Sequence, residues 1–198
     1  MSNRILALVM GIAVTFFAGA SNAADNPTVV IETSMGNIEV ELNAGKAPET
    51  VKNFLAYVND KFYDDTVFHR VMPTFMIQGG GFSKDLKEKP TKAPIKNESE
   101  NGLKNEKGTI AMARLQDPHS ANAQFFINVV DNAMLDRANS PDRWGYCVFG
   151  KVTAGMDVVN KIKDTPTGSA KGQTHGMSID LDDVPKEPVI IKSITVKK

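Results

Sequence analysis

The sequence has few of the residues that build disulfides and metal sites. Its 198 residues include one cysteine, Cys147, and three histidines. A single cysteine excludes an intramolecular disulfide, so the stability of the fold has to come from packing. The histidines, His69, His119 and His175, have neither short spacing nor cysteines beside them, so no metal site is expected. No other cofactor is expected either.

The chain also lacks an excess of charge of either sign. It has 23 basic and 23 acidic side chains, so the net charge is zero with histidine neutral. Binding to nucleic acid or to an anionic membrane surface normally requires clustered positive charge. The lysine-rich segment 84–96 also holds Asp85 and Glu88, which is typical of a solvated face. Neither nucleic acid nor a membrane surface is therefore expected as a partner.

Motifs of nucleotide binding and of serine hydrolysis are missing as well. The run Gly79-Gly80-Gly81 is not followed by the Gly-Lys-Ser/Thr sequence of a phosphate-binding loop. The sequence Gly-x-Ser-x-Gly, which carries the nucleophile of many hydrolases, occurs nowhere in the chain. Reactions of these two classes are therefore not expected.

An apolar run occupies the N-terminus. It covers residues 5–20, follows a single basic residue, Arg4, and precedes the small residues Ser21 and Ala23. This pattern is typical of a secretory signal peptide that is cleaved after Ala23. A membrane anchor is the alternative, but the run is shorter than the ~20 residues that span hydrocarbon.

We therefore expect residues 1–23 to be a signal peptide and residues 24–198 to form a single domain. That length is sufficient for one domain with a substantial core. Export by a Gram-negative bacterium would place the domain in the periplasm, with no membrane contact after cleavage. A monomer is expected.

Short segments rich in β-branched and aromatic residues recur along the chain and predict strands. Only two segments have helical periodicity: residues 48–59, which begin with a proline, and a shorter segment after Met156. Many strands with two helices indicate an all-β sheet or barrel. The predicted strands cover residues 29–33, 38–42, 66–72, 75–78, 109–113, 124–129, 146–152 and 189–196.

Two segments have no apolar period. Residues 82–107 are crowded with Lys, Pro, Asn, Glu and Gly, which predicts a long surface excursion. Residues 165–176 are rich in Gly, Ser and Thr, which predicts a flexible loop.

The most informative segment is residues 68–81, with the sequence FHRVMPTFMIQGGG. It sets one permanently charged guanidinium, Arg70, among large apolar side chains. Arginine donates hydrogen bonds but is a poor proton carrier, and rotation about a peptide bond needs no proton transfer. His69 adjoins Arg70, but strand alternation would send its side chain to the opposite face. A structural role is therefore expected for His69.

Two glutamines lie among apolar residues of the predicted strands. Gln78 shares a face with Met76, and Gln124 shares a face with Phe126. A buried amide needs a hydrogen-bonding partner, so these glutamines either lie in a pocket or are exposed at the surface. The residues alone leave both alternatives open.

Residues 68–81 resemble the signature of the cyclophilin family of peptidyl-prolyl cis-trans isomerases. Residues 108–114, 124–128 and 148–152 resemble the family's other blocks in the same order, and the resemblance spans about residues 28–196. It implies a closed eight-stranded antiparallel β-barrel capped by two α-helices. It also implies isomerisation of Xaa-Pro bonds in unfolded or newly exported proteins, without covalent or acid-base chemistry.

The resemblance also implies roles for the site residues. Arg70 would donate a hydrogen bond to the prolyl nitrogen, and Gln78 would orient Arg70 and contact the substrate backbone. The backbone of Arg114 would hold the residue that precedes proline, and the Tyr146 hydroxyl would contact the peptide. The other implied substrate-binding residues are Phe75, Met76, Ala113, Gln124, Phe126, Met134 and Leu135.

Three residues differ from the best-known eukaryotic cyclophilins. Met134 stands where they have Trp, Arg114 where they have Asn, and Tyr146 where they have His. That Trp forms a hydrogen-bonding wall for cyclosporin, so the sequence predicts weak cyclosporin binding.

Two alternative functions are compatible with the sequence. A binding module or holdase chaperone would recognise proline-containing segments without turnover and would not depend on Arg70. A structural subunit would use the barrel only as an interaction surface. The apolar pocket residues argue against this second alternative.

Overall fold

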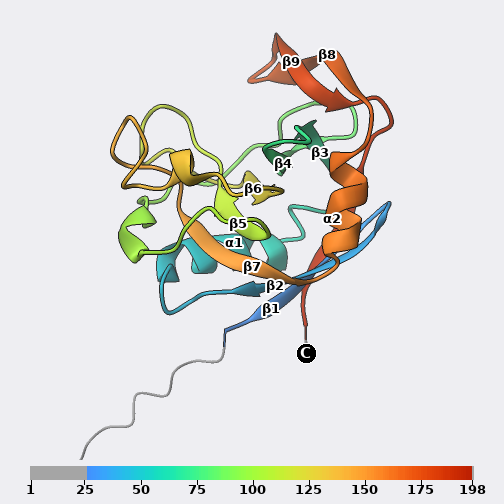
Figure 1. Ribbon diagram of the computed structural model, residues 1–198. Helices are drawn as coiled ribbons and strands as arrows, with labels where there is room; N and C mark the ends of the chain where they lie inside the picture. Colours follow the sequence, from blue (N-terminus) through green and yellow to red (C-terminus); the bar gives the residue numbers. More distant parts are fainter. Residues whose placement is uncertain (1–25, 198) are drawn as a thin grey trace, which may run out of the picture.

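The computed structural model describes residues 26–197, so the expected signal peptide lies outside the described residues. Eight strands form a closed antiparallel barrel in the order β1-β10-β3-β4-β6-β5-β7-β2 (Figure 1). The predicted fold class is therefore confirmed. The barrel strands are β1 (Thr28–Thr33), β2 (Gly36–Leu42), β3 (Thr66–Val71), β4 (Met76–Ser83), β5 (Thr109–Met112), β6 (Phe125–Asn128), β7 (Val148–Ala154) and β10 (Ile190–Val196).

Helix α1 (Pro48–Asn59) anchors an aromatic cluster in the core of the domain. Its proline takes the first helical turn, where the missing N–H costs no hydrogen bond. Phe54 is fully buried, and its ring centroid lies 5.2 Å from that of Tyr63, 5.7 Å from that of Phe125 and 5.3 Å from that of Phe149. Such aromatic contacts add to the large apolar area that these rings bury.

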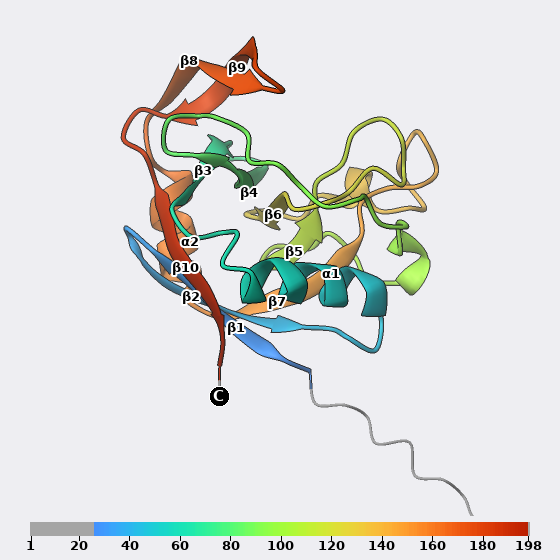
Figure 2. The same ribbon diagram turned by 180° about the vertical axis from the view of Figure 1, so that it is seen from behind.

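Helix α2 (Met156–Lys163) contacts the barrel at a different place from α1 (Figures 1 and 2). It buries Val159 and Ile162 completely. Gly155 precedes the helix with a φ of 87°, and a Cβ added there would overlap the backbone oxygen of Asn37. Both the left-handed conformation and the close approach to strand β2 require glycine at this position.

The prediction of a flexible loop over residues 165–176 is wrong. Strands β8 (Thr167–Thr174) and β9 (Met177–Pro185) pair in a separate two-stranded sheet, drawn in orange-red in Figure 1. The hairpin is joined to the segment after β4, because Gln173 N donates to Leu86 O and Glu88 N donates to Gln173 O, each at 2.8 Å. Backbone pairing defines these strands, since most of their side chains are polar or small and few are buried.

The surface excursion contains little regular structure. After β4 ends at Ser83, the described chain has one short 3₁₀ helix, η1 (Ser99–Asn101), before β5. A second 3₁₀ helix, η2 (Ala133–Leu135), follows β6. Over residues 26–197, no helix combines the length and the hydropathy needed to cross a membrane.

Candidate active site

A second apolar cluster lies apart from the barrel interior. Ile77 and Ile127 belong to the interior core, so their strand neighbours Met76 and Phe126 point to the other side of the sheet. Met76 and Phe126 are 2% and 4% exposed. An outer face is normally polar, so a buried apolar cluster there needs a covering layer or a ligand. The partly buried residues that pack on it are Met72, Phe75, Leu103, Ala113, Leu135 and Tyr146.

One row of paired residues runs across the strands of this face. Arg70 pairs with Gln78, Gln78 with Phe126, Phe126 with Ala111, and Ala111 with Val148. Residues directly opposite on antiparallel strands point to the same side of a sheet. The row therefore sets a guanidinium and an amide beside a continuous apolar surface.

A cavity of about 490 Å³ lies over this row. Among the expected site residues, only Met134 does not line it; Met134 is 57% exposed on η2. The expected residues that line the cavity are Arg70, Phe75, Met76, Gln78, Ala113, Arg114, Gln124, Phe126, Leu135 and Tyr146.

Five further residues line the cavity, although the sequence did not predict them as part of the site. His69 and Phe82 come from β3 and β4, and Asp180, Leu181 and Asp182 come from β9. The alternating apolar and acidic residues of β9 could have predicted a strand. No sequence pattern placed that strand over the cavity, because β9 pairs only with β8 and reaches the barrel through tertiary contacts.

The side-chain amides of the two glutamines form a hydrogen bond with each other in the cavity. Gln78 Nε2 donates to Gln124 Oε1 at 2.9 Å, and both residues are half-buried. The pocket alternative is thus the one that fits the structure. Gln78, which the resemblance expects to orient Arg70, lies opposite Arg70 on the neighbouring strand, and Nε of Arg70 also lies 3.6 Å from Oδ2 of Asp183.

The side chain of His69 does not leave the site as strand alternation predicted. The pairing of β3 with β4 shifts between Phe68 and Arg70, where two residues of β3 match one step of β4. This bulge breaks the alternation, and both His69 and Arg70 line the cavity. His69 is 5% exposed, and its ring centroid lies 4.6 Å from that of Phe82. Burial lowers its pKa from 6.5 to about 4, and the nearby Arg70 charge adds to this effect.

Arg114 holds the segment that carries Tyr146. Its guanidinium donates to Gly145 O at 3.0 Å, pairs with the Asp142 carboxylate, and lies 4.6 Å above the Tyr146 ring. Burial alone would raise the pKa of Asp142, but hydrogen bonds from Ser140, the Trp144 and Gly145 backbone and Arg114 together lower it. The side chain of Arg114 is therefore part of the cavity wall.

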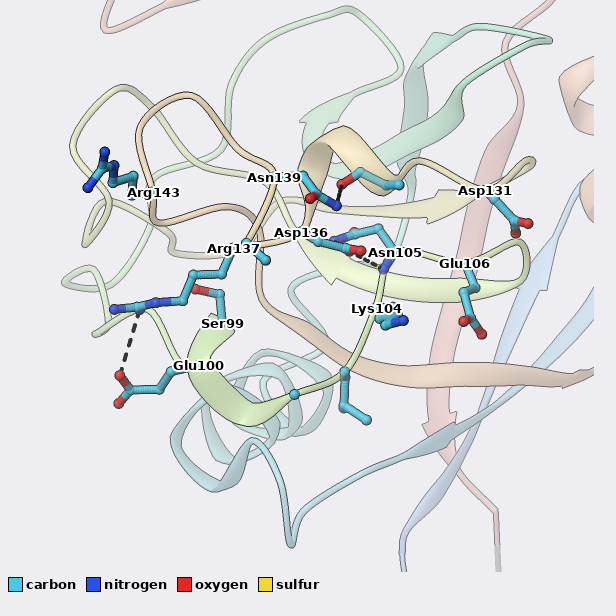
Figure 3. A pocket seen from close by; sticks show the side chains of 14 residues that line it. Ser99, Glu100, Lys104, Asn105, Glu106, Asp131, Asp136, Arg137, Asn139 and Arg143 are labelled. Carbon is cyan, nitrogen blue, oxygen red and sulfur yellow. Dashed lines mark hydrogen bonds and ion pairs between the residues drawn. The ribbon is translucent and has the colours of Figure 1, made fainter.

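A larger cavity of about 1140 Å³ lies elsewhere on the surface (Figure 3). Its lining mixes both signs of charge, and several of these side chains bind one another. Asn105 Nδ2 donates to Asp136 Oδ1 at 3.2 Å, and Arg137 Nη1 lies 3.7 Å from Glu100 Oε2. The smaller cavity is the better candidate site, because it combines apolar walls with a few convergent polar groups.

The single cysteine of the chain is buried. Cys147 is 4% exposed, and burial raises the pKa of its thiol to about 11, so it behaves as a small buried apolar residue. Within residues 26–197, no three His, Cys, Asp or Glu side chains gather in a way that could hold a metal ion.

Comparisons with known proteins identify relatives of the chain. The family model of the cyclophilin type peptidyl-prolyl cis-trans isomerases matches residues 28–196. Peptidyl-prolyl cis-trans isomerase B of Escherichia coli is 57% identical, over 86% of this chain and 99% of its own length. Peptidyl-prolyl cis-trans isomerase A of Dickeya dadantii is 48% identical over the whole of both chains. A cyclophilin type isomerase of Cryptosporidium parvum, crystallised in the presence of the dipeptide Ala-Pro, has a TM-score of 0.68 and 26% identity, over 86% of this chain and 99% of its own.

We predict that acid destabilises the fold through His69. The unfolded chain takes up this proton at a pKa of 6.5, whereas the folded protein takes it up only near 4. The contribution of the neutral, buried His69 to the free energy of unfolding is therefore fully present above about pH 6.5, and it is lost as the pH falls toward 4. At ~1.36 kcal/mol per pKa unit, the loss reaches roughly 3 kcal/mol.

Urea unfolding of the wild type and of His69→Gln, at about pH 7 and about pH 4.5, measures this effect. The difference in unfolding free energy between the two pH values should be smaller in the variant. His175→Gln, which changes an exposed imidazole, is the control. Equal pH dependence in the wild type and His69→Gln would contradict the prediction.

Proposed function

This chain belongs to the cyclophilin-type peptidyl-prolyl cis-trans isomerases and is an enzyme of that class, and we propose that Arg70 and the adjoining apolar cavity catalyse its reaction. Its substrates are Xaa-Pro bonds in unfolded or newly exported polypeptides. The Ala-Pro dipeptide present with the similar Cryptosporidium structure supports this class of ligand. In this proposal the enzyme is a monomer and needs no cofactor.

The reaction is a rotation, and its barrier decides what the site has to supply. Twisting the prolyl peptide bond breaks amide resonance and meets a barrier of ~18–20 kcal/mol. The uncatalysed rotation takes tens of seconds or more. Milliseconds require an acceleration of roughly 10⁴-fold, which corresponds to about 5.5 kcal/mol of transition-state stabilisation.

Arg70 supplies the polar part of this stabilisation. The prolyl nitrogen regains a lone pair as the bond twists, so a donor aimed at it binds the twisted state better than the planar one. Arg70 is half-buried beside the apolar wall and stays protonated. A charge-assisted hydrogen bond contributes about 1.5–3 kcal/mol, so the guanidinium alone is insufficient.

The apolar wall supplies the rest. The proline ring lies against Phe75, Met76, Phe126 and Leu135, with Ala113 beside it. Water stabilises the charge-separated resonance form of the planar amide, so its removal from the bound amide lowers the rotation barrier. The half-buried Gln78 and Gln124 amides, already paired with each other, are placed to contact the peptide backbone. Tyr146 and the backbone of Arg114 bind the residues that flank the proline.

We predict that Arg70→Ala lowers kcat/KM for an Ala-Pro peptide by about 10- to 150-fold, which is the rate equivalent of one charge-assisted hydrogen bond. The cis-to-trans relaxation of the peptide measures this directly, and circular dichroism checks that the variant is folded. Arg143→Ala removes an exposed guanidinium outside the cavity and should keep wild-type activity.

Two outcomes would reject parts of this proposal. If folded wild-type protein gives no acceleration, the protein is a binding module or holdase for proline-containing segments. If Arg70→Ala keeps full activity, the guanidinium has no role in the chemistry.

Weak cyclosporin binding is proposed from the identity of residue 134. Met134 cannot donate the hydrogen bond that an indole N–H provides. We predict inhibition of the wild type only well above nanomolar cyclosporin, and roughly fivefold tighter inhibition of Met134→Trp, as one net hydrogen bond of about 1 kcal/mol implies. Inhibition of the wild type at nanomolar drug would contradict this prediction. Met177 is exposed on β9, so Met177→Trp is a control that adds a tryptophan at another surface position.

Export to the periplasm completes the proposal. The family match begins at residue 28, so the apolar run 5–20 lies outside the isomerase domain and is available as a signal. We predict that the periplasmic fraction of a Gram-negative host contains a protein that begins at Ala24, as N-terminal sequencing would show. Ala23→Lys, which replaces the small residue before the cleavage site, should block processing. Uncleaved wild-type protein would contradict the prediction.

A further inference from the structure

The charged neighbour of the candidate catalytic guanidinium comes from the unpredicted hairpin. Arg70 Nε lies 3.6 Å from Asp183 Oδ2, and the two side chains are 42% and 36% exposed. Arg70 lies in β3 and Asp183 in β9, and these strands are in contact although they do not pair. The ion pair therefore joins the barrel to the hairpin at the site, and its role rests on the function proposed above.

A β-bulge puts Asp183 in place. Val184 pairs with Gly168 and Leu181 pairs with Ala170, so Asp182 and Asp183 both lie opposite Ser169. The extra residue breaks the alternation of side chains along β9. Asp183 has a φ of 58°, a left-handed conformation that aspartate tolerates better than most residues.

The neighbouring aspartates of β9 are paired within the hairpin. Asp182 Oδ1 accepts a hydrogen bond from Ser169 Oγ at 2.7 Å, and Asp180 lies 2.6 Å from Lys171 Nζ. Asp183 instead pairs with Arg70. The bulge thus turns the Asp183 carboxylate toward Arg70, while Asp180 and Asp182 line the cavity beside it.

We propose that Asp183 is a positioning residue for Arg70. A free arginine side chain has many rotamers, and fixing it before the substrate binds removes that entropic cost from the reaction. Asp183 pairs with Nε, and the hydrogen bonds and ion pairs among residues 26–197 include none to the Nη groups of Arg70. The Nη groups stay available to the prolyl nitrogen while the carboxylate restrains the guanidinium at the edge of the cavity.

A double-mutant cycle with the Ala-Pro peptide tests the proposal. Asp183→Asn keeps the shape of the side chain and tolerates the left-handed backbone, so it removes only the charge. We predict that it lowers kcat about three- to fivefold with little change in KM, the range of a partly exposed ion pair. In the Arg70→Ala background the same substitution should have no effect, whereas a structural defect would lower activity in both backgrounds.

Two further variants make the outcome decisive. Asp183→Gly also accepts a positive φ and should lower kcat as much as Asp183→Asn does. Asp157→Asn breaks a 3.7 Å ion pair with Lys161 on α2 and should leave kcat unchanged. Unchanged kcat in both Asp183 variants, or equal losses in both Arg70 backgrounds, would overturn the inference alone. An inactive wild type, or a fully active Arg70→Ala, would overturn the proposed function as well.

Discussion

The site depends on the register of the antiparallel strands. Because Arg70 faces Gln78, Gln78 faces Phe126, and Phe126 faces Ala111, four strands contribute to one side of the sheet. A slip of one residue in any strand would exchange its cavity side chain for a core side chain. Closing the barrel removes the free edges along which such a slip could begin. The same closure that stabilises the fold therefore keeps the guanidinium beside the apolar wall.

The core that stabilises the fold and the candidate site lie on opposite sides of the barrel sheet. The interior holds the aromatic cluster around Phe54 and most of the buried aliphatic residues, and this burial supplies the main driving force for folding. The second cluster, around Met76 and Phe126, is small and lies on the other side of the sheet. The fold therefore depends little on this second cluster, and the partly buried residues that pack on it form the cavity wall that a ligand can contact.

The sequence was most informative where periodicity and local geometry agree. The helix at Pro48–Asn59 and the barrel strands follow from apolar spacing, and the cavity residues from β4 and β6 follow from the family resemblance that the FHRVMPTFMIQGGG segment carries. His69 was misplaced because a bulge in β3 interrupts the alternation on which the prediction relied. The β8–β9 hairpin was missed because backbone pairing with little burial holds it together. Its approach to Arg70 is a tertiary contact, which no local pattern encodes.

The neutral imidazole next to Arg70 fits a reaction without proton transfer. A second cation at His69 would be repelled by the Arg70 charge and would draw water into the cavity. Burial and the Arg70 charge both lower the pKa of His69, to about 4, so the imidazole stays uncharged at neutral pH. Arg70 keeps its charge over the same range. The charge that His69 and Arg70 present to the cavity is therefore constant across physiological pH, which suits a rotation that moves no proton.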